Sequence, residues 1–308
     1  MTVGLSGRRV LVTGANGFLG SHLLARLVAT GAQMDGVSRS SSAGRSADVR
    51  WWQLDLGDAH ATARMISLVR PEFVFHLAGQ TTADRHIDLV LPVFRSNLQG
   101  TINLLTAVAR IEPARVILAG SLEEPGALDA DPVPSSPYAA TKWASTGYAR
   151  MFHDLWGLPV TALRVSMAYG PGQRDMSKLI PYVISSLLEG RMPKLTSGTR
   201  KVDWVYVDDV VEAFVAAARS PGAAGAVMDI GSGSSVSIRA TVDLVKQIMS
   251  PGLEVKFGAC QDRPRDTGRL ADISVARQLI GWEPSTDLQQ GLGQTIRWYQ
   301  DSLHNGTL

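Results

Sequence analysis

The sequence predicts an α/β fold with a doubly wound parallel sheet and a smaller C-terminal α/β lobe. Two observations indicate this fold. Strand-like and helix-like runs alternate through the first half of the chain, which is typical of a parallel sheet with helices on both faces. A glycine-rich turn also follows the first strand directly, at the edge of the sheet where such folds bind their ligands.

Six apolar, β-rich runs mark the expected strands of the sheet. They are residues 9–13, 32–37, 51–54, 73–77, 115–119 and 160–165. After Gly170-Pro171-Gly172 the pattern becomes less regular, because Pro, Gly and Arg are scattered through the chain. We therefore expect a Rossmann dinucleotide-binding domain and a substrate-binding lobe. The domain comprises residues 1–172 with 205–235 returning to it, and the lobe comprises 173–204 and 236–308.

Composition narrows the class of protein. At 308 residues and 45% hydrophobic, the chain can bury a full core. The formal net charge of +2 comes from interspersed charges, so neither nucleic acid nor an anionic membrane is an expected partner. Cys260 is the single cysteine and no apolar run approaches a membrane span, which favours a cytoplasmic location. No His, Cys or carboxylate cluster has metal-ligand spacing, so we expect no metal.

Residues 13–20, TGANGFLG, are typical of a turn that binds a dinucleotide between a strand and a helix. Gly14 permits the tight turn, Gly17 lets the backbone approach a pyrophosphate, and Gly20 lets the helix pack closely on the strand. The helix N-terminus attracts the phosphates. The alternative is an ordinary glycine-rich turn. The expected cofactor contacts are Gly14, Asn16, Gly17, Phe18, Leu19 and Gly20.

The end of the second strand indicates which dinucleotide binds. An NAD site normally places an acid there to bind the ribose 2′-OH, whereas an Arg suits the 2′-phosphate of NADP. Here the strand ends in Ser38-Arg39-Ser40-Ser41, and Asp35 falls within the strand, where its side chain would point away from the tip. Ser38 in place of an acid removes the repulsion of a 2′-phosphate, and the planar guanidinium of Arg39 can bind that phosphate. We predict NADP(H) over NAD(H), with contacts at Ser38, Arg39 and Ser40; a solvated loop is the alternative.

Ser121 at the end of the fifth strand, followed by Tyr138 and Lys142 at the start of a helix, predicts a catalytic centre. A phenol has a reference pKa near 10, so acid or base chemistry at neutral pH needs a downward shift of roughly 3 units. Lys142 lies on the same helix face as Tyr138, and its charge together with an oxidised nicotinamide would favour phenolate. Ser121 could donate to the substrate carbonyl. A Tyr and a Lys four residues apart also occur by chance, so the order of the whole set carries the prediction.

Further motifs accompany this set. They are Asp55-Leu56, His76-Leu77-Ala78-Gly79, Asn97 to Thr101, Arg164 with Tyr169-Gly170-Pro171, Val205 to Asp209, and Gly281-Trp282-Glu283-Pro284 before Trp298-Tyr299. Over essentially its whole length the chain resembles the extended short-chain dehydrogenase/reductase family, of the NAD-dependent epimerase/dehydratase type. The resemblance implies hydride transfer at carbon 4 of a nucleotide-linked hexose, and a homodimer formed through the Tyr138 helix. It also implies cofactor contacts at Asp55, Leu56, Leu77, Ala78, Gly79, Asn97, Tyr138 and Lys142.

The residues after Ser121 bear on the reaction. Dehydratases of this family place an acid or Ser and then Glu there; Glu123 stands at the Glu position, but Leu122 cannot take a proton. The Glu123-Glu124 pair looks more like GDP-4-keto-6-deoxymannose reductases, which favour NADPH. We predict NADPH-dependent reduction of a nucleotide-linked 4-keto-6-deoxyhexose, with Ser121, Tyr138, Lys142 and Glu123 as catalytic residues. The alternatives are a nucleotide-sugar 4-epimerase or 4,6-dehydratase with tightly bound NAD(P), and a non-enzymatic NADP(H)-sensing protein.

Two departures from the family pattern concern the substrate. Met167 stands where an Asn commonly holds the sugar or its phosphate, and Val202 stands where an Arg is usual. Basic residues elsewhere in the second lobe could meet the diphosphate instead, although surface solvation is the alternative for each. The expected substrate contacts are Gln80, Arg174, Lys178, Arg200, Lys201 and Arg263.

Overall fold

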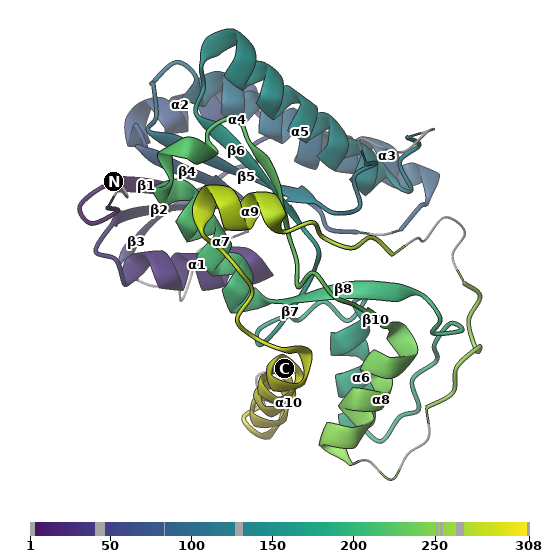
Figure 1. Cartoon of the computed structure of the whole chain (residues 1–308). Coiled ribbons are helices and arrows are strands. Elements are labelled where there is room, and N and C mark those ends of the chain that lie inside the picture. The colour runs from purple at the N-terminus through teal and green to yellow at the C-terminus, as the bar shows by residue number, and fades with distance from the viewer. Residues whose placement is uncertain are drawn as a thin grey trace. The chain divides into compact units, whose positions relative to one another are not determined.

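The computed structural model describes residues 4–40, 47–82, 84–126, 132–250, 252, 255–262 and 268–306. The chain forms two compact units. The first unit consists of Met1–Val165, Val211–Ile230 and Ser274–Trp282, and the second consists of Ser166–Val210, Gly231–Ile273 and Glu283–Leu308. Elements of both units are labelled in Figure 1.

The first unit is built on a seven-stranded sheet with the order β3-β2-β1-β4-β5-β6-β9, in which every neighbouring pair is parallel. The strands are β1 (Arg9–Thr13), β2 (Gln33–Ser38), β3 (Val49–Gln53), β4 (Phe73–His76), β5 (Arg115–Ser121), β6 (Val160–Val165) and β9 (Val227–Ile230). All six predicted strands are present. β5 runs two residues beyond its predicted end, which makes Ser121 the last residue of the strand.

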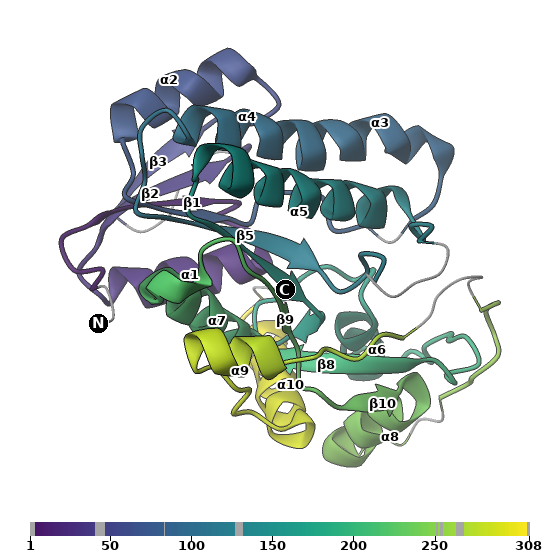
Figure 2. The ribbon, with the colours of Figure 1, turned by 45° about the horizontal axis from the view of Figure 1, so that its top comes forward.

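Helices cover both faces of this sheet, as the alternating pattern predicts. Figure 2 shows α2, α4 and α5 over one face and α1, α7 and α9 over the other. The helices are α1 (Phe18–Val28), α2 (Ala59–Val69), α4 (Gly100–Val108), α5 (Pro137–Trp156), α7 (Val207–Arg219) and α9 (Ser274–Ile280). Three short segments, η1 (Ile87–Leu89), α3 (Val90–Val93) and η2 (Phe94–Gln99), lead into α4, and η3 (Pro221–Ala223) follows α7. Because both faces are covered, every residue of β4 and β5 is buried.

Helix α5 begins and ends at residues whose chemistry explains its limits. The Ser136 hydroxyl accepts a hydrogen bond from the Ala139 amide at 3.1 Å, and Pro137 occupies the first helical position. Gly157, with φ of 66°, ends the helix in the left-handed conformation. These signals place Tyr138 in the first turn of α5.

The described part of the second unit contains a three-stranded sheet of order β10-β8-β7 together with helices α6, α8 and α10. The strands are β7 (Met167–Tyr169), β8 (Lys201–Tyr206) and β10 (Ser235–Ser237), and the helices are α6 (Leu179–Leu188), α8 (Ile238–Met249) and α10 (Leu288–His304). β8 pairs in parallel with β7 and antiparallel with β10. The ring of Tyr169 makes edge contacts with Trp204 and Tyr206 at centroid distances of 6.1 and 5.8 Å.

The unit boundaries differ from those predicted. We assigned residues 166–172, 205–210 and 231–235 to the dinucleotide-binding domain, whereas they lie in the second unit, where β8 pairs with β7 and β10 in a separate sheet. We assigned 274–282 to the substrate lobe, but they belong to the first unit, because α9 packs against β9 and η3. Strand pairing and packing between distant segments set these boundaries, and local sequence does not encode them.

Candidate functional site

The glycine turn has the backbone geometry that its sequence predicts. Gly14 has a φ of 67°, in the left-handed region that favours glycine. A Cβ added to Gly20 would lie only 2.1 Å from the Gly14 carbonyl oxygen, so only glycine lets α1 begin this close to β1. The N-cap residue of α1, Gly17, provides no side-chain cap, and the first turn of the helix holds no acid. This cradle of backbone amides fits the pyrophosphate of a dinucleotide.

The tip of β2 lies beside the glycine turn. The Ser38 hydroxyl is buried; it lies 3.1 Å from the Ser40 hydroxyl and accepts a hydrogen bond from the Ser40 amide. The Asn16 amide in turn donates to the Ser40 hydroxyl at 2.8 Å. The structure therefore brings Asn16, Ser38 and Ser40 together. The Arg39 side chain is exposed, while its carbonyl accepts a hydrogen bond from Gln53.

Asp35 points away from the strand tip, as predicted. Its carboxylate is 7% exposed and accepts hydrogen bonds from Arg50 Nε and Trp52 Nε1, both at 2.6 Å. Hydrogen bonding to Asp35 raises the pKa of Arg50. Asp35 is thus used within the sheet, between β2 and β3.

Residues expected beside the cofactor follow the next strands. The Asp55 carboxylate accepts the Gly57 amide at 2.9 Å and pairs with Arg95 at 3.3 Å. Leu56 is buried in the core. After β4, Leu77 and Ala78 are half-buried and Gly79 is exposed. All of these residues lie at or just beyond the carboxyl ends of β3 and β4, where this sheet is expected to meet its ligand.

Asn97 holds the loop after β4. Its Oδ1 accepts hydrogen bonds from the Gln80 amide at 2.7 Å and from the Ser96 hydroxyl at 2.8 Å. Its Nδ2 donates to the Gln80 carbonyl at 3.0 Å and to the Thr141 hydroxyl at 3.3 Å. These four bonds use the full capacity of a side-chain amide. Asn97 therefore positions the loop after β4 against α5, and its contact with the cofactor stays a prediction.

Ser121, Tyr138 and Lys142 come together at the end of β5. Tyr138 and Lys142 lie one turn apart on α5, and the Lys142 ammonium is 5.9 Å from the centre of the Tyr138 ring. The side chains of Tyr138 and Ser121 form a hydrogen bond, which lowers the pKa of the Tyr138 phenol. Lys142 Nζ donates to the Ala119 carbonyl at 2.7 Å, two residues before Ser121 on the same strand. The strand and the helix thus present all three predicted groups at one edge of the sheet.

In the protein without its cofactor, the pKa of Tyr138 is raised above the value of a free phenol. Burial raises the pKa of the phenol above its usual value, and the charges of Glu123 and Glu124 raise it further, while the hydrogen bond with Ser121 lowers it. Burial also lowers the pKa of Lys142 to about 8, against an opposing effect of Glu124. We expected the Lys142 charge to lower the phenol pKa; in the protein alone, loss of hydration outweighs any such effect.

The two carboxylates after Ser121 have different surroundings. Glu123 is half-buried, and its backbone amide donates to the Ser121 hydroxyl at 3.2 Å. Glu124 is 1% exposed, and its carboxylate accepts the Ser121 amide at 2.7 Å. The sequence analysis gave a catalytic role to Glu123 and none to Glu124. The sequence contains the Glu123-Glu124 pair, but the turn after β5 determines that the Glu124 carboxylate accepts the Ser121 amide. Leu122, between them and Ser121, is buried.

The basic residues expected to meet the substrate are spread over several elements of the second unit. Arg174 is exposed, with its guanidinium 5.9 Å from the Trp298 ring. Lys178 is the N-cap residue of α6, Arg200 directly precedes β8, and Lys201 begins β8. Arg263 lies outside the described residues.

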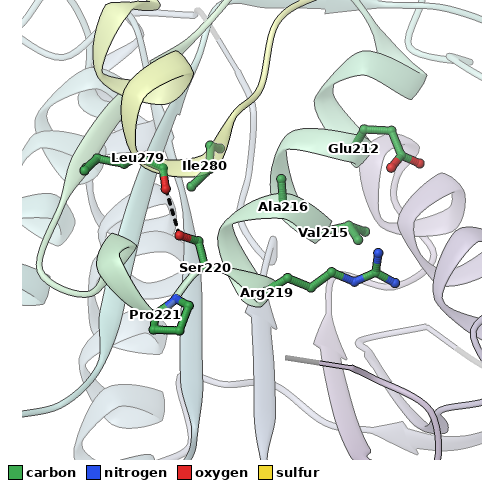
Figure 3. A pocket seen from close by; sticks show the side chains of 8 residues that line it. All are labelled: Glu212, Val215, Ala216, Arg219, Ser220, Pro221, Leu279 and Ile280. Carbon is green, nitrogen blue, oxygen red and sulfur yellow. Dashed lines mark hydrogen bonds between the residues drawn. The ribbon is translucent and has the colours of Figure 1, made fainter. Parts of the chain in front are cut away.

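Figure 3 shows a pocket of about 460 Å³ between α7 and α9 in the first unit. Its lining residues are Glu212, Val215, Ala216, Arg219, Ser220, Pro221, Leu279 and Ile280. The Ser220 hydroxyl donates to the Leu279 carbonyl at 2.7 Å, which ties α9 to the end of α7. None of the predicted site residues lines this pocket, so it is separate from the Ser121, Tyr138 and Lys142 centre.

The described residues contain neither a metal-binding cluster nor a membrane-spanning helix. Among them, no group of three or more His, Cys, Asp or Glu side chains is arranged to hold a metal ion. Within the same residues, no helix has both the length and the apolar character needed to cross a membrane.

The chain is similar to known proteins over most of its length. It is 31% identical over 315 residues to the UDP-glucose 4-epimerase of Mycolicibacterium smegmatis, covering 95% of this chain and 99% of that protein. It is 30% identical over 328 residues to a dTDP-glucose 4,6-dehydratase of Xanthomonas campestris, covering 94% and 92%. The structure of a Thermotoga maritima UDP-glucose 4-epimerase with UDP-glucose matches with a TM-score of 0.88 and 27% identity, over 96% of this chain and 99% of that one.

These relatives are epimerases and dehydratases, so the particular closeness to GDP-4-keto-6-deoxymannose reductases is not confirmed. The family itself is confirmed. A family profile described as "NAD dependent epimerase/dehydratase family" matches residues 10–231, which include the glycine turn, Ser121, Tyr138 and Lys142. The chain belongs to the NAD dependent epimerase/dehydratase family, the extended branch of the short-chain dehydrogenase/reductase enzymes.

Proposed function

We propose that this protein is a nucleotide-sugar 4-epimerase. The observation that carries the proposal is the meeting of Ser121, Tyr138 and Lys142 at the end of β5, with buried Leu122 where a dehydratase needs a proton-transferring residue. Removal of water from a sugar requires such a residue, whereas oxidation and reduction at carbon 4 do not. Similarity to the Mycolicibacterium smegmatis UDP-glucose 4-epimerase supports the same choice.

This choice replaces the reduction that the Glu123-Glu124 pair favoured in the sequence. The relatives reported above agree better with the epimerase alternative than with a reductase. The structure also removes part of the argument for the pair, because Glu124 is buried against the Ser121 amide and is not exposed beside Glu123.

Tyr138 is the proton-transferring group of the proposed reaction. In its phenolate form it takes the proton from the sugar 4-hydroxyl, and in its phenol form it returns a proton to the 4-keto oxygen. The Ser121 hydroxyl holds that oxygen by a hydrogen bond. Lys142 supplies a positive charge one helical turn away. When bound, the nicotinamide supplies the hydride acceptor and, in its oxidised form, a second positive charge that favours phenolate.

We propose that the glycine turn and the β2 tip bind NADP(H) in preference to NAD(H). Among the described residues, no acidic side chain stands at the tip of β2: Ser38 ends the strand, and Asp35 is held by Arg50 and Trp52. A 2′-phosphate would therefore meet hydroxyl groups and the exposed Arg39 guanidinium, without carboxylate repulsion.

We propose that the first unit holds the cofactor and that the second contributes contacts to the sugar nucleotide. Arg174, Lys178, Arg200 and Lys201 supply the positive charge for a diphosphate. In the first unit, the Gln80 side-chain oxygen is buried and has no hydrogen-bond partner among the described residues. An unpaired buried acceptor suits a sugar hydroxyl, because leaving it unmatched is costly.

The test incubates purified protein with UDP-, GDP- and dTDP-hexoses, with and without added NADP, NAD and NADPH. We expect the C4 epimer to form with no net consumption of reduced cofactor, because each hydride removed is returned. Stoichiometric loss of NADPH with a 4-keto-6-deoxyhexose would identify a reductase, and a 4-keto-6-deoxy product would identify a dehydratase. Cofactor binding without conversion of any sugar nucleotide would favour a sensing protein.

A further inference from the structure

Glu124 stands out among the groups that the proposed reaction does not use. Its side chain is 1% exposed, and charged side chains are rarely buried this completely unless their partners justify the cost. Its carboxylate accepts the backbone amide of Ser121 at 2.7 Å, and its own amide donates to the Ser121 carbonyl at 3.1 Å. Glu124 therefore closes a tight turn around the residue that is to hold the substrate oxygen.

The backbone around Glu124 is shaped to accept a carboxylate. A Cβ added to Gly120 would lie 2.8 Å from Glu124 Oε1, so a larger residue at position 120 would displace the carboxylate. Arg164 on β6 also lies close to this position, because the same Cβ would lie 3.3 Å from Arg164 Cγ. The Arg164 guanidinium is itself held by Asp229 at 2.7 Å. A glycine at 120 and an ion-paired arginine at 164 thus lie next to the buried acid.

Charged and titratable groups face Glu124 from two elements besides its own turn. Lys142, Tyr138 and Thr146 lie on α5 at intervals of four residues, which places them on one face of the helix. Arg164 faces it from β6, and Glu123 lies in the same turn. Burial raises the pKa of Glu124, while the Ser121 amide, the Thr146 hydroxyl and the charges of Lys142 and Arg164 lower it. Glu124 in turn raises the pKa of Lys142 and that of Tyr138.

We propose that Glu124 is a positioning residue: its buried carboxylate fixes the Ser121 backbone by accepting the Ser121 amide, and balances the charge of Lys142. The effect on turnover rests on the epimerase function proposed above; the effect on the backbone does not. Glu124 acts through Ser121 and Lys142 and does not itself touch the sugar.

The test compares Glu124→Gln, which keeps a hydrogen-bond acceptor and loses the charge, with Glu124→Met, which keeps the volume and loses both. Asp35→Asn is the matched control, because Asp35 is a buried and hydrogen-bonded acid in the same unit, remote from β5. Cofactor dissociation constants and melting temperatures identify variants that are folded.

The first readout is independent of activity. Hydrogen exchange, followed by mass spectrometry on peptides that span Ser121, reports whether its amide is still bonded. We expect faster exchange at this amide in Glu124→Met by about tenfold or more, and near-parental exchange in Glu124→Gln and Asp35→Asn. If Glu124→Met does not fold, Glu124→Gln still tests the charge through the second readout. Unchanged Ser121 exchange in a folded Glu124→Met protein would overturn the proposal.

The second readout is the pH dependence of kcat. Removing the negative charge lowers the pKa of both Lys142 and Tyr138, so both limbs of the profile should move to lower pH in Glu124→Gln. We expect kcat to fall by about tenfold to a hundredfold in Glu124→Met with little change in KM, and less in Glu124→Gln. An unmoved profile in Glu124→Gln would overturn the charge role. If the parental protein converts no sugar nucleotide, the proposed function fails while the exchange experiment still decides the role of Glu124.

Discussion

Lys142 is buried and Tyr138 is half-buried, and loss of hydration favours the uncharged form of each group. It raises the pKa of the phenol and lowers the pKa of the ammonium to about 8. The ligand-free protein therefore keeps Tyr138 protonated near neutral pH. In the proposed reaction, a second positive charge near the phenol would help Tyr138 to act as a base, and a bound oxidised nicotinamide would supply one.

Replacing Tyr138 by Phe tests the proton-transfer role. We expect Tyr138→Phe to lower kcat by at least about a thousandfold, because no other phenol lies at this site to exchange the proton. The dissociation constant for the cofactor should change by less than about threefold, since only one hydroxyl is lost. The matched control is Tyr148→Phe, a partly exposed tyrosine on the same helix, which should keep its activity. Turnover retained by Tyr138→Phe would contradict the assignment.

Ser38 is the residue on which cofactor choice is predicted to depend. In Ser38→Asp, a carboxylate at the tip of β2 would repel a 2′-phosphate and accept a ribose hydroxyl. We expect the dissociation constant for NADP to rise by about tenfold or more and that for NAD to fall. Fluorescence titration of both cofactors against both proteins measures the change. A parental protein that already binds NAD more tightly would show that the NADP(H) proposal is wrong.

At the scale of elements, one buried histidine connects β4, β1 and α4. His76 is 1% exposed, and its ring nitrogens lie 2.7 Å from the Thr13 hydroxyl and 2.8 Å from the Thr101 hydroxyl. Burial, followed by the charge of Lys142, lowers its pKa from 6.5 to about 3. The neutral ring of His76 on β4 therefore connects Thr13 on β1 with Thr101 on α4. Burial disfavours protonation of the ring in this position.

This depressed pKa predicts loss of stability in acid. The unfolded chain binds a proton at His76 below about pH 6.5, whereas the folded chain binds it only near pH 3. The stabilisation that neutral His76 gives the folded protein is therefore complete above pH 6.5 and is lost as the pH falls to about 3. The loss is up to about 5 kcal/mol of unfolding free energy. Urea unfolding of the parental protein and of His76→Gln at several pH values measures it. We expect the two proteins to converge in stability as the pH falls; a constant difference would refute the prediction.

At the scale of the whole molecule, the first unit carries an apolar surface that its own core does not use. Ile87, Leu91 and Phe94, in η1, α3 and η2, are 75%, 75% and 45% exposed, and Trp143 on α5 is 42% exposed. α3 and η2 pack against α5, so these side chains belong to neighbouring elements. Exposed apolar groups of this size typically mark an interface. We propose that they form the interface of the homodimer through the Tyr138 helix, α5, that the family resemblance implies.

Leu91→Glu tests this interface. We expect the parental protein to have twice the chain mass of 33.0 kDa in light scattering, and Leu91→Glu to have the mass of one chain at micromolar concentration, because a charge would be buried unpaired. Leu68→Glu on α2 is the matched control, since Leu68 is 67% exposed on a different helix. A parental protein of single-chain mass, or a Leu91→Glu protein that stays dimeric, would contradict the proposal.

Local sequence determined much of this protein. Apolar runs marked six strands, the glycine turn fixed the start of α1, and Ser136-Pro137 fixed the start of α5. Helical spacing then put Tyr138 and Lys142 one turn apart. These features depend on residues that are close in the chain, where periodicity and capping chemistry act directly.

Only the tertiary structure decided the remaining points. It placed Glu124, not Glu123, behind Ser121, used Asn97 to hold the loop after β4, and put β8 in a separate sheet. It also raised the pKa of Tyr138 in the protein without its cofactor. Each of these outcomes depends on burial and on pairing between segments far apart in the chain. The sequence alone names the charged and polar groups, but the loss of water around them, which sets their pKa values and their partners, is a property of the packed fold.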